Sequence, residues 1–258
     1  EAIPSLDRLS RRQTPMTLGQ VCVDVQSTTT CPVLKAVFEP TQYTHECILP
    51  APVMERAFWN PIVQASRRLY GPHLPITVFG DLHQWCLAVS PSAAPSTRRG
   101  PRSETQRYDK GIHYTPPALV NYLTSRALGQ AFTGLSPEQV LQRRILDPSC
   151  GCGVFLVAAL RYLFAWLEKG KPGAISLQDR LDILGRMIHG TDLDVRAVGW
   201  TRRGLLLAAW DGHRKPDQGS ITVPELSQNI IARDFLTPAP IGTGEGIDVI
   251  LGGPPFVR

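Results

Sequence analysis

The chain has 258 residues, of which 43% are hydrophobic and 19% charged. This balance excludes a disordered or fibrous protein, and no apolar run approaches the roughly 20 residues that a membrane-spanning helix needs. The six cysteines form neither a C-x-x-C pair nor a dense disulfide pattern, so we expect free thiols and a cytoplasmic protein with no membrane partner. The net charge of +5 is compatible with a polyanionic partner but does not require one.

Residues 1–105 are predicted to form a mainly helical region. Apolar residues recur at helical spacing in 45–70 and again in 76–89, whereas the β-branched run Val21–Val25 favours a short strand. Residues 90–107 are rich in proline, serine and arginine and predict a linker that ends the region. The basic residues at the end of this linker are interpreted as solvated, with contact to nucleic-acid phosphates as the alternative.

Beyond the linker, short apolar segments alternate with amphipathic ones, a pattern typical of an α/β fold with a parallel sheet. We predict that this domain spans residues 106–258. The predicted strands are residues 144–146, 187–191, 229–233 and 247–251. The predicted helices are residues 117–129, 153–168, 176–184 and 194–210.

The loop after the first of these strands combines an acidic residue with two glycines. Gly151 and Gly153 allow a ligand to approach the backbone closely, and the next helix offers unsatisfied N–H groups at its start. A carboxylate at Asp147 would repel a pyrophosphate but can pair with an ammonium group. The loop therefore predicts S-adenosylmethionine, rather than a dinucleotide, as the cofactor. The lone C-x-C of Cys150 and Cys152 predicts no metal site.

The second and third strands also end at carboxylates. Asp192 stands where an acid in dinucleotide-type folds accepts two ribose hydroxyls. Asp194 is more simply interpreted as the N-cap of the next helix. Asp234 follows the third strand, beside Phe235, and could accept the amine of an adenine ring, with an ordinary turn residue as the alternative.

Four segments follow one another in the order known from one family of DNA-modifying enzymes, and these are Phe79–Leu82, Gly111–Pro117, Asp147–Phe155 and Asp248–Arg258. Across these segments the chain resembles the gamma-type amino-group DNA methyltransferases, in particular the Eco57I-like adenine methyltransferases of bacterial restriction-modification systems. The resemblance implies a Rossmann-like sheet that binds S-adenosylmethionine and transfers its methyl group to N6 of an adenine extruded from double-stranded DNA. It also implies a restriction or specificity module as a further partner.

The resemblance assigns roles to individual residues. Those that would bind the cofactor are Tyr114, Thr115, Asp147, Ser149, Gly151, Gly153, Asp192, Asp234 and Phe235. The catalytic loop that would receive the base consists of Gly253, Pro254, Pro255 and Phe256. This chemistry requires no metal.

The catalytic loop departs from the family pattern at Gly253, where the family has Asn, Asp or Ser, and at Phe256, where Tyr is commonest. An exocyclic adenine amine is a poor nucleophile, and a side-chain oxygen together with the carbonyl of the next proline would orient its lone pair toward the methyl group. Glycine leaves only the Pro254 carbonyl. Phe256 can still stack on an extruded base. Because these departures leave Asp147, Asp192 and Asp234 in place, we expect cofactor binding with impaired methyl transfer.

Two alternatives follow from these departures. The four predicted strands are fewer than the family's complete sheet contains, and the sequence ends at Arg258, so we expect a catalytic domain truncated after the catalytic loop. The chain could therefore be a catalytically silent subunit that binds cofactor or DNA. A second alternative keeps the enzyme class but changes the acceptor to cytosine N4 or a protein glutamine amide, since the same loop serves any planar amine.

Overall fold

The computed structural model describes the chain in ten segments, which are residues 16–17, 20, 22–23, 26–27, 31–41, 48–49, 115–169, 175–211, 220–237 and 246–254. The chain divides into two compact units. One comprises Glu1–Tyr114 together with Pro255–Arg258, and the other comprises Thr115–Pro254. The boundary predicted near residue 105 lies outside the described residues and stays a prediction.

The described part of the first unit contains two short strands and a helix. Strands β1 (Met16–Thr17) and β2 (Ile48–Leu49) pair in antiparallel fashion. Helix α3 (Pro32–Val37) begins with a proline at its first position, where the missing N–H has no intrahelical partner in any case. The helix buries Val33 and Val37.

Two predictions for this unit are wrong at the residues that can be compared. Cys22 and Val23 are helical, although a strand was expected across Val21–Val25. Ile48 lies in strand β2, although a helix was expected over 45–70. Local propensity over so few residues is weak and yields to pairing with distant segments, here with β1. The remainder of 45–70 and the helix predicted at 76–89 lie outside the described residues.

The second unit is built on a four-stranded parallel sheet in the order β5-β4-β3-β6. The strands are β3 (Ile145–Asp147), β4 (Ile188–Asp192), β5 (Ile230–Ala232) and β6 (Val249–Ile250). Strands β4 and β5 therefore lie on one side of β3, and β6 lies on its other side. Because all strands are parallel, their carboxyl ends share one edge, and the reversal of order beside β3 is where open α/β sheets bind ligands.

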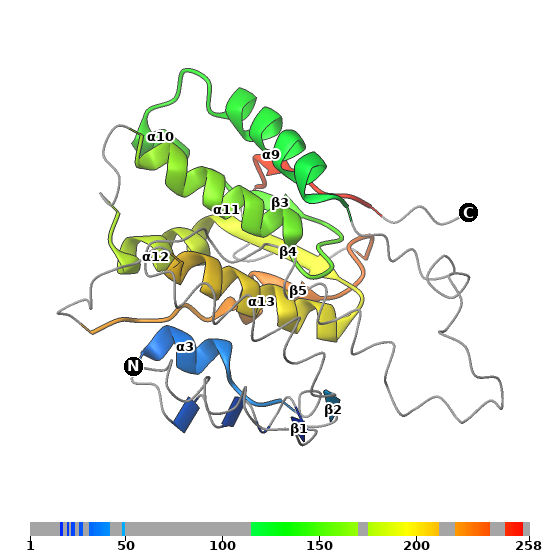
Figure 1. The fold of residues 1–258 in the computed structure, drawn as a ribbon. Coiled ribbons are helices and arrows are strands. Elements are labelled where there is room, and N and C mark those ends of the chain that lie inside the picture. Colours follow the sequence, from blue (N-terminus) through cyan, green and yellow to red (C-terminus); the bar gives the residue numbers. More distant parts are fainter. Residues whose placement is uncertain are drawn as a thin grey trace. The chain divides into compact units, whose positions relative to one another are not determined.

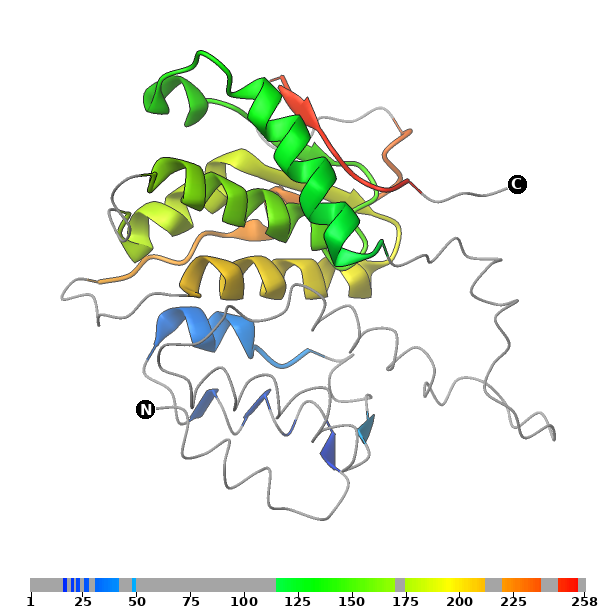
Figure 2. The ribbon, with the colours of Figure 1, turned by 45° about the horizontal axis from the view of Figure 1, so that its top comes forward.

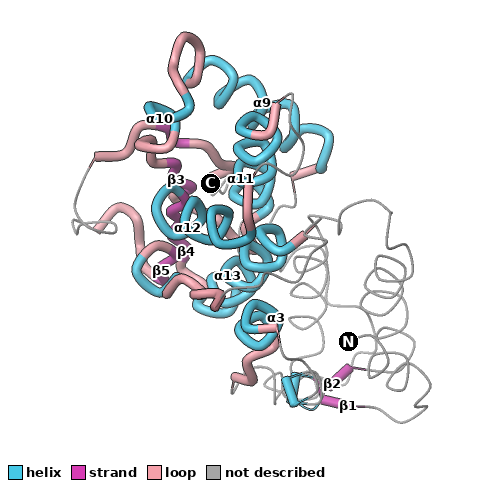
Figure 3. Tube along the Cα trace, turned by 90° about the vertical axis from the view of Figure 1, so that its left-hand side faces the viewer, coloured by secondary structure: helices cyan, strands magenta, loops and turns pink. Residues whose placement is uncertain are grey.

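Helices precede, separate and cover the strands. They are α9 (Pro117–Ala131), α10 (Pro137–Val140), α11 (Val154–Leu167), α12 (Leu177–Met187), α13 (Val195–Trp210) and the 3-10 turn η2 (Leu226–Gln228). Helices α9 and α13 pack on either side of α11 (Figure 1, Figure 2). Figure 3 shows this row of helices against one face of the sheet. The predicted mixed α/β fold is confirmed, and each strand and helix predicted for the second unit lies within a few residues of its predicted range. The short helix α10 and the turn η2 were not predicted.

The core of this unit lies between the sheet and the row of helices. Every residue of β3 is buried, and so are most residues of α11, which is enclosed by the sheet and by both neighbouring helices. Among the described residues, no helix combines the length and apolar character needed to cross a membrane.

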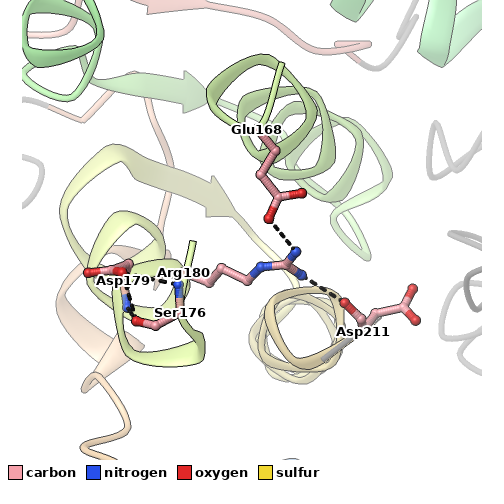
Figure 4. A network of polar contacts seen from close by, with 5 residues as sticks. All are labelled: Glu168, Ser176, Asp179, Arg180 and Asp211. Atoms are coloured by element: carbon pink, nitrogen blue, oxygen red, sulfur yellow. Dashed lines mark hydrogen bonds and ion pairs between the residues drawn. The ribbon is translucent and has the colours of Figure 1, made fainter. Parts of the chain in front are cut away.

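Two helices of the unit begin with reciprocal capping boxes. Ser136 and Gln139 close the start of α10, and Ser176 and Asp179 close the start of α12 (Figure 4). In each pair the serine oxygen accepts the backbone N–H three residues later, while the later side chain accepts the serine's own N–H. Both pairs satisfy donors that a helix start leaves open.

Arg180 of α12 joins the ends of two other helices. Its guanidinium donates to the Glu168 carboxylate at 2.9 Å and to the backbone carbonyl of Asp211 at 2.8 Å (Figure 4). It also lies 4.8 Å from the ring centroid of Phe164. Arg161 pairs with the Asp211 carboxylate at 3.1 Å. The cluster stands where α11 and α13 end, away from the carboxyl ends of the strands.

Replacing Arg180 by methionine is expected to lower the free energy of unfolding by about 1–3 kcal/mol, since the poorly exposed Glu168 carboxylate and a backbone carbonyl lose their partner. Methionine keeps an apolar stem near Phe164, so the loss of stability measures mainly the hydrogen bonds and the ion pair that the guanidinium makes. Urea denaturation measures the change. Arg126→Met, at an exposed position of α9, is the matched control and should stay within about 0.5 kcal/mol of the wild type. Equal stability of both variants would show that the cluster contributes nothing.

Candidate functional site

The loop between β3 and α11 makes a tight turn through two glycines. Gly151 and Gly153 have φ values of +52° and +81°, in the left-handed region that residues with a side chain rarely adopt. The N–H of Gly153 donates to the Cys150 carbonyl at 2.7 Å, and the N–H of Cys150 donates to the Thr191 carbonyl at 2.8 Å. A Cβ on Gly153 would lie only 2.7 Å from Cγ2 of Thr201, so this glycine is required for conformation and space alike.

Asp147 ends β3 and is almost fully enclosed, with 1% of its surface exposed. Burial raises the pKa of its carboxyl group to about 7, the Ser149 N–H at 3.0 Å from Oδ1 opposes this shift, and the charge of Asp192 adds to it. A Cβ on Gly252, just after β6, would come within 2.9 Å of the Asp147 carboxyl carbon. The backbone at Gly252 therefore covers the carboxyl group that was predicted to meet the cofactor directly.

Asp192 ends β4 and connects it to the glycine loop. Its Oδ2 accepts the N–H of Gly151 at 2.8 Å, and its Oδ1 accepts the N–H of Asp194 at 2.9 Å. The N–H of Arg233, after β5, donates to the backbone carbonyl of Asp192 at 2.8 Å. A carboxylate has about four acceptor positions, so each oxygen of this half-buried side chain keeps capacity for a ligand.

Asp194 is the N-cap of α13, as predicted. Its side chain accepts the backbone N–H of Arg196 at 2.9 Å and also pairs with the side chain of that arginine. The described contacts of this carboxylate therefore serve the start of α13.

Asp234 and Phe235 lie exposed beyond β5. The Asp234 carboxylate accepts the N–H of Leu236 at 2.9 Å, which is the contact of an ordinary turn residue. Its predicted role toward an adenine ring stays a prediction.

The start of α9, the start of α11 and the loop after β6 meet at Gly253. A Cβ at this position would lie 3.1 Å from Oγ1 of Thr115 and 3.3 Å from Cε2 of Phe155. Pro254 follows and is exposed. Three further predicted site residues, Tyr114, Pro255 and Phe256, lie outside the described residues.

The structure thus brings most predicted residues to the carboxyl ends of β3, β4 and β6, in three local pairs. The Asp147 carboxyl group packs against the backbone at Gly252, and the Asp192 carboxylate accepts the N–H of Gly151. The backbone at Gly253 lies beside the Thr115 side chain. Sequence reasoning missed the contribution of Gly252 and that of two buried threonines, Thr191 and Thr201, whose hydroxyls donate to the carbonyls of Pro148 and Gly151. Nothing in their spacing distinguishes these threonines from ordinary core residues.

Cysteines and acidic residues near the loop form no metal cluster. Among the residues that the structure describes, no group of three or more His, Cys, Asp or Glu side chains could hold a metal ion. Neither Cys150 nor Cys152 forms a disulfide, and burial raises the pKa of the Cys150 thiol well above its usual value.

Comparison with known proteins confirms the resemblance read from the motifs. The chain is 24% identical over 182 residues to the type II restriction enzyme and methyltransferase RM.Eco57I of Escherichia coli, covering 59% of this chain. It is 32% identical over 155 residues, or 57% of the chain, to the type II methyltransferase M.BstVI of Geobacillus stearothermophilus. It is 28% identical over 120 residues, or 46% of the chain, to the adenine-specific methyltransferase PglX of Streptomyces coelicolor. All three are methyltransferases by name, in agreement with the predicted enzyme class.

These matches cover only part of each relative, namely 18% of RM.Eco57I, 25% of M.BstVI and 10% of PglX. No protein-family model matches the chain. Among solved structures, a nuclease-deletion mutant of the type ISP restriction-modification enzyme LlaGI, bound to a DNA substrate mimic, aligns with a TM-score of 0.37 and 14% identity over 93% of this chain and 22% of that one.

Proposed function

We propose that the chain carries the cofactor-binding part of an S-adenosylmethionine-dependent methyltransferase that acts on adenine N6 in double-stranded DNA. The observation that carries the proposal is the hydrogen bond from Gly151 to Asp192, which joins the glycine loop of β3 to the acid at the end of β4. This pair lies at the edge of the sheet where a Rossmann-like fold binds a ribose and the group attached to it. Three relatives that are methyltransferases by name support the same class.

The residues at this edge fit the cofactor. Ser149 Oγ is enclosed and has no hydrogen-bond partner in the protein, so a polar group of a ligand could satisfy it. A Cβ on Gly151 would meet no atom within 4 Å, which leaves space beside the loop. Asp192 would accept ribose hydroxyls, Ser149 and Thr115 would bind the amino-acid part, and the adenine ring would lie toward Asp234 and Phe235.

When bound, the cofactor would supply an electrophilic methyl group. The chain would contribute the Pro254 carbonyl as an acceptor for one amine hydrogen of the target base, and Phe256 as a surface on which an extruded base stacks. Gly253 has no side chain that could accept the second hydrogen. The buried Asp147 would act from beneath the site, through the N–H of Ser149 that its carboxyl group orients.

Two measurements test the proposal. Isothermal titration should show S-adenosylmethionine binding to the unmodified chain, and no binding at millimolar cofactor would contradict the proposal. The second follows radioactive methyl groups from the cofactor into unmethylated DNA, which is then digested to nucleosides, and in a parallel reaction into protein, which is digested to peptides. Label in N6-methyladenine supports the proposal, whereas label in N4-methylcytosine or in a glutamine-containing peptide would assign the chain to another acceptor.

Asp192→Ala is expected to weaken cofactor binding by on the order of 1–3 kcal/mol, because charge-assisted hydrogen bonds to the ribose and the hold on Gly151 are lost together. Asp194→Ala is the control, since it removes a neighbouring carboxylate whose described contacts belong to the cap of α13. This control should cost about 1 kcal/mol of stability and leave affinity unchanged. Equal affinity of both variants would remove Asp192 from the cofactor site.

A second function is favoured by Gly253, which removes one of the two acceptors expected for the amine. The chain would then bind cofactor or DNA without transferring a methyl group. Cofactor binding without label in any nucleoside or peptide would support this function. A DNA duplex and a restriction or specificity module are the partners we propose for the complete protein in either case.

A further inference from the structure

Thr201 lies directly behind the glycine loop, although it is 50 residues away in the chain. The side chain is fully buried on α13. Its hydroxyl donates to the carbonyl of Gly151 at 2.7 Å. Its methyl carbon occupies the space that a Cβ on Gly153 would need, 2.7 Å from that position. One side chain therefore contacts both glycines of the loop.

The hydroxyl fixes the orientation of one peptide unit. Peptides are planar and trans, so a Gly151 carbonyl that points to Thr201 directs the N–H of Cys152 to the opposite side. The preceding peptide is fixed separately, because the N–H of Gly151 donates to Asp192 at 2.8 Å. Glycine at φ +52° could adopt many other conformations, and these two bonds restrict it to one.

We propose that Thr201 is a positioning residue, whose hydroxyl holds the Gly151–Cys152 peptide in the orientation that binds S-adenosylmethionine. This inference rests on the proposed cofactor function. A loop that is already ordered does not lose conformational freedom when the ligand binds, so the bond raises affinity without touching the ligand. Threonine suits the position because its hydroxyl reaches one glycine while its methyl group packs on the other.

The experiment compares two threonine-to-valine substitutions in the whole 258-residue chain. Thr201→Val keeps shape and removes the hydrogen bond to the loop. Thr124→Val makes the same change at a threonine of α9 that is 2% exposed and whose hydroxyl has no partner in the protein. Titration calorimetry with S-adenosylmethionine gives the dissociation constant, and thermal unfolding without ligand gives the melting temperature.

Thr201→Val is expected to raise the dissociation constant about tenfold, whereas Thr124→Val should change it by less than about twofold. A purely structural role would lower the melting temperature of Thr201→Val and leave its dissociation constant at the wild-type value, and that result would overturn the inference. Absence of binding to the unmodified chain is a different outcome, since it would overturn the proposed function and the inference with it.

A second pair of variants applies if Thr201→Val does not fold. Thr201→Ser and Thr201→Ala both lack the methyl group and differ only in the hydroxyl. The serine variant should bind within about twofold of the wild type and the alanine variant about tenfold more weakly. Equal affinity of the two would overturn the inference.

Discussion

The free energy of unfolding is expected to fall by about 3 kcal/mol as the pH rises from 4 to 7, because Asp147 ionises in the unfolded chain over this range but keeps its proton in the folded one. Asp147→Asn should abolish this fall. The pKa of the carboxyl group is about 7 in the folded chain against an ordinary 3.8, chiefly because of burial. Between these values the folded state holds a proton that the unfolded state releases. Stability from this group is therefore complete below pH 3.8 and is lost as the pH rises through 7. Each unit of pKa difference corresponds to about 1.4 kcal/mol.

Urea unfolding of the wild type and of Asp147→Asn at several pH values measures the effect, because asparagine resembles the protonated acid and can still accept the Ser149 N–H. Asp182→Asn, at an exposed position of α12, controls for loss of a carboxylate. His189 has the opposite effect on the pH dependence of stability. Burial lowers its pKa, so its contribution to stability is lost as the pH falls. The wild type and Asp147→Asn both contain His189, so the difference between their unfolding free energies at each pH reports on Asp147 alone. Parallel pH curves would refute the prediction.

Local patterns suffice to predict the four strands and the four longer helices of the second unit, because nearby residues determine each of them. The apolar run before Asp147 predicts β3, and glycine at 153 with the apolar segment that follows predicts the start of α11. Asp194 was recognised as a cap from its position alone. These features depend on neighbours within a few positions in the chain.

Contacts between distant segments could not be predicted in the same way. Gly252 covers Asp147 from a position about a hundred residues later in the chain, and the expected direct contact between this carboxylate and a ligand took no account of that cover. Thr201 reaches Gly151 only because α13 packs against α11. In the first unit, pairing of Ile48 with Thr17 overrides the helical periodicity around it. Packing between elements decides each of these cases.

Gly253→Asn is expected to raise the rate of methyl transfer to adenine about a hundredfold, because it supplies a second preorganised acceptor for the amine, typically worth ~3 kcal/mol in the transition state. The backbone permits the change, since φ at this glycine is not in the left-handed region. The new Cβ would lie 3.1 Å from Thr115 Oγ1 and 3.3 Å from Phe155, so both neighbours must shift by a few tenths of an ångström. Cofactor affinity should barely change.

Gly253→Ala separates the acceptor from the packing change, because alanine adds the same Cβ against Thr115 and Phe155 but brings no oxygen. We expect the alanine variant to be no faster than the glycine protein. Single-turnover assays in the longest natural form of the chain, with DNA and saturating cofactor, measure the chemical step for all three proteins. If the glycine protein already matches the asparagine variant, the Pro254 carbonyl and other groups suffice to orient the amine. If alanine and asparagine accelerate the reaction equally, the gain comes from repositioning the loop around Thr115 and not from the amide oxygen.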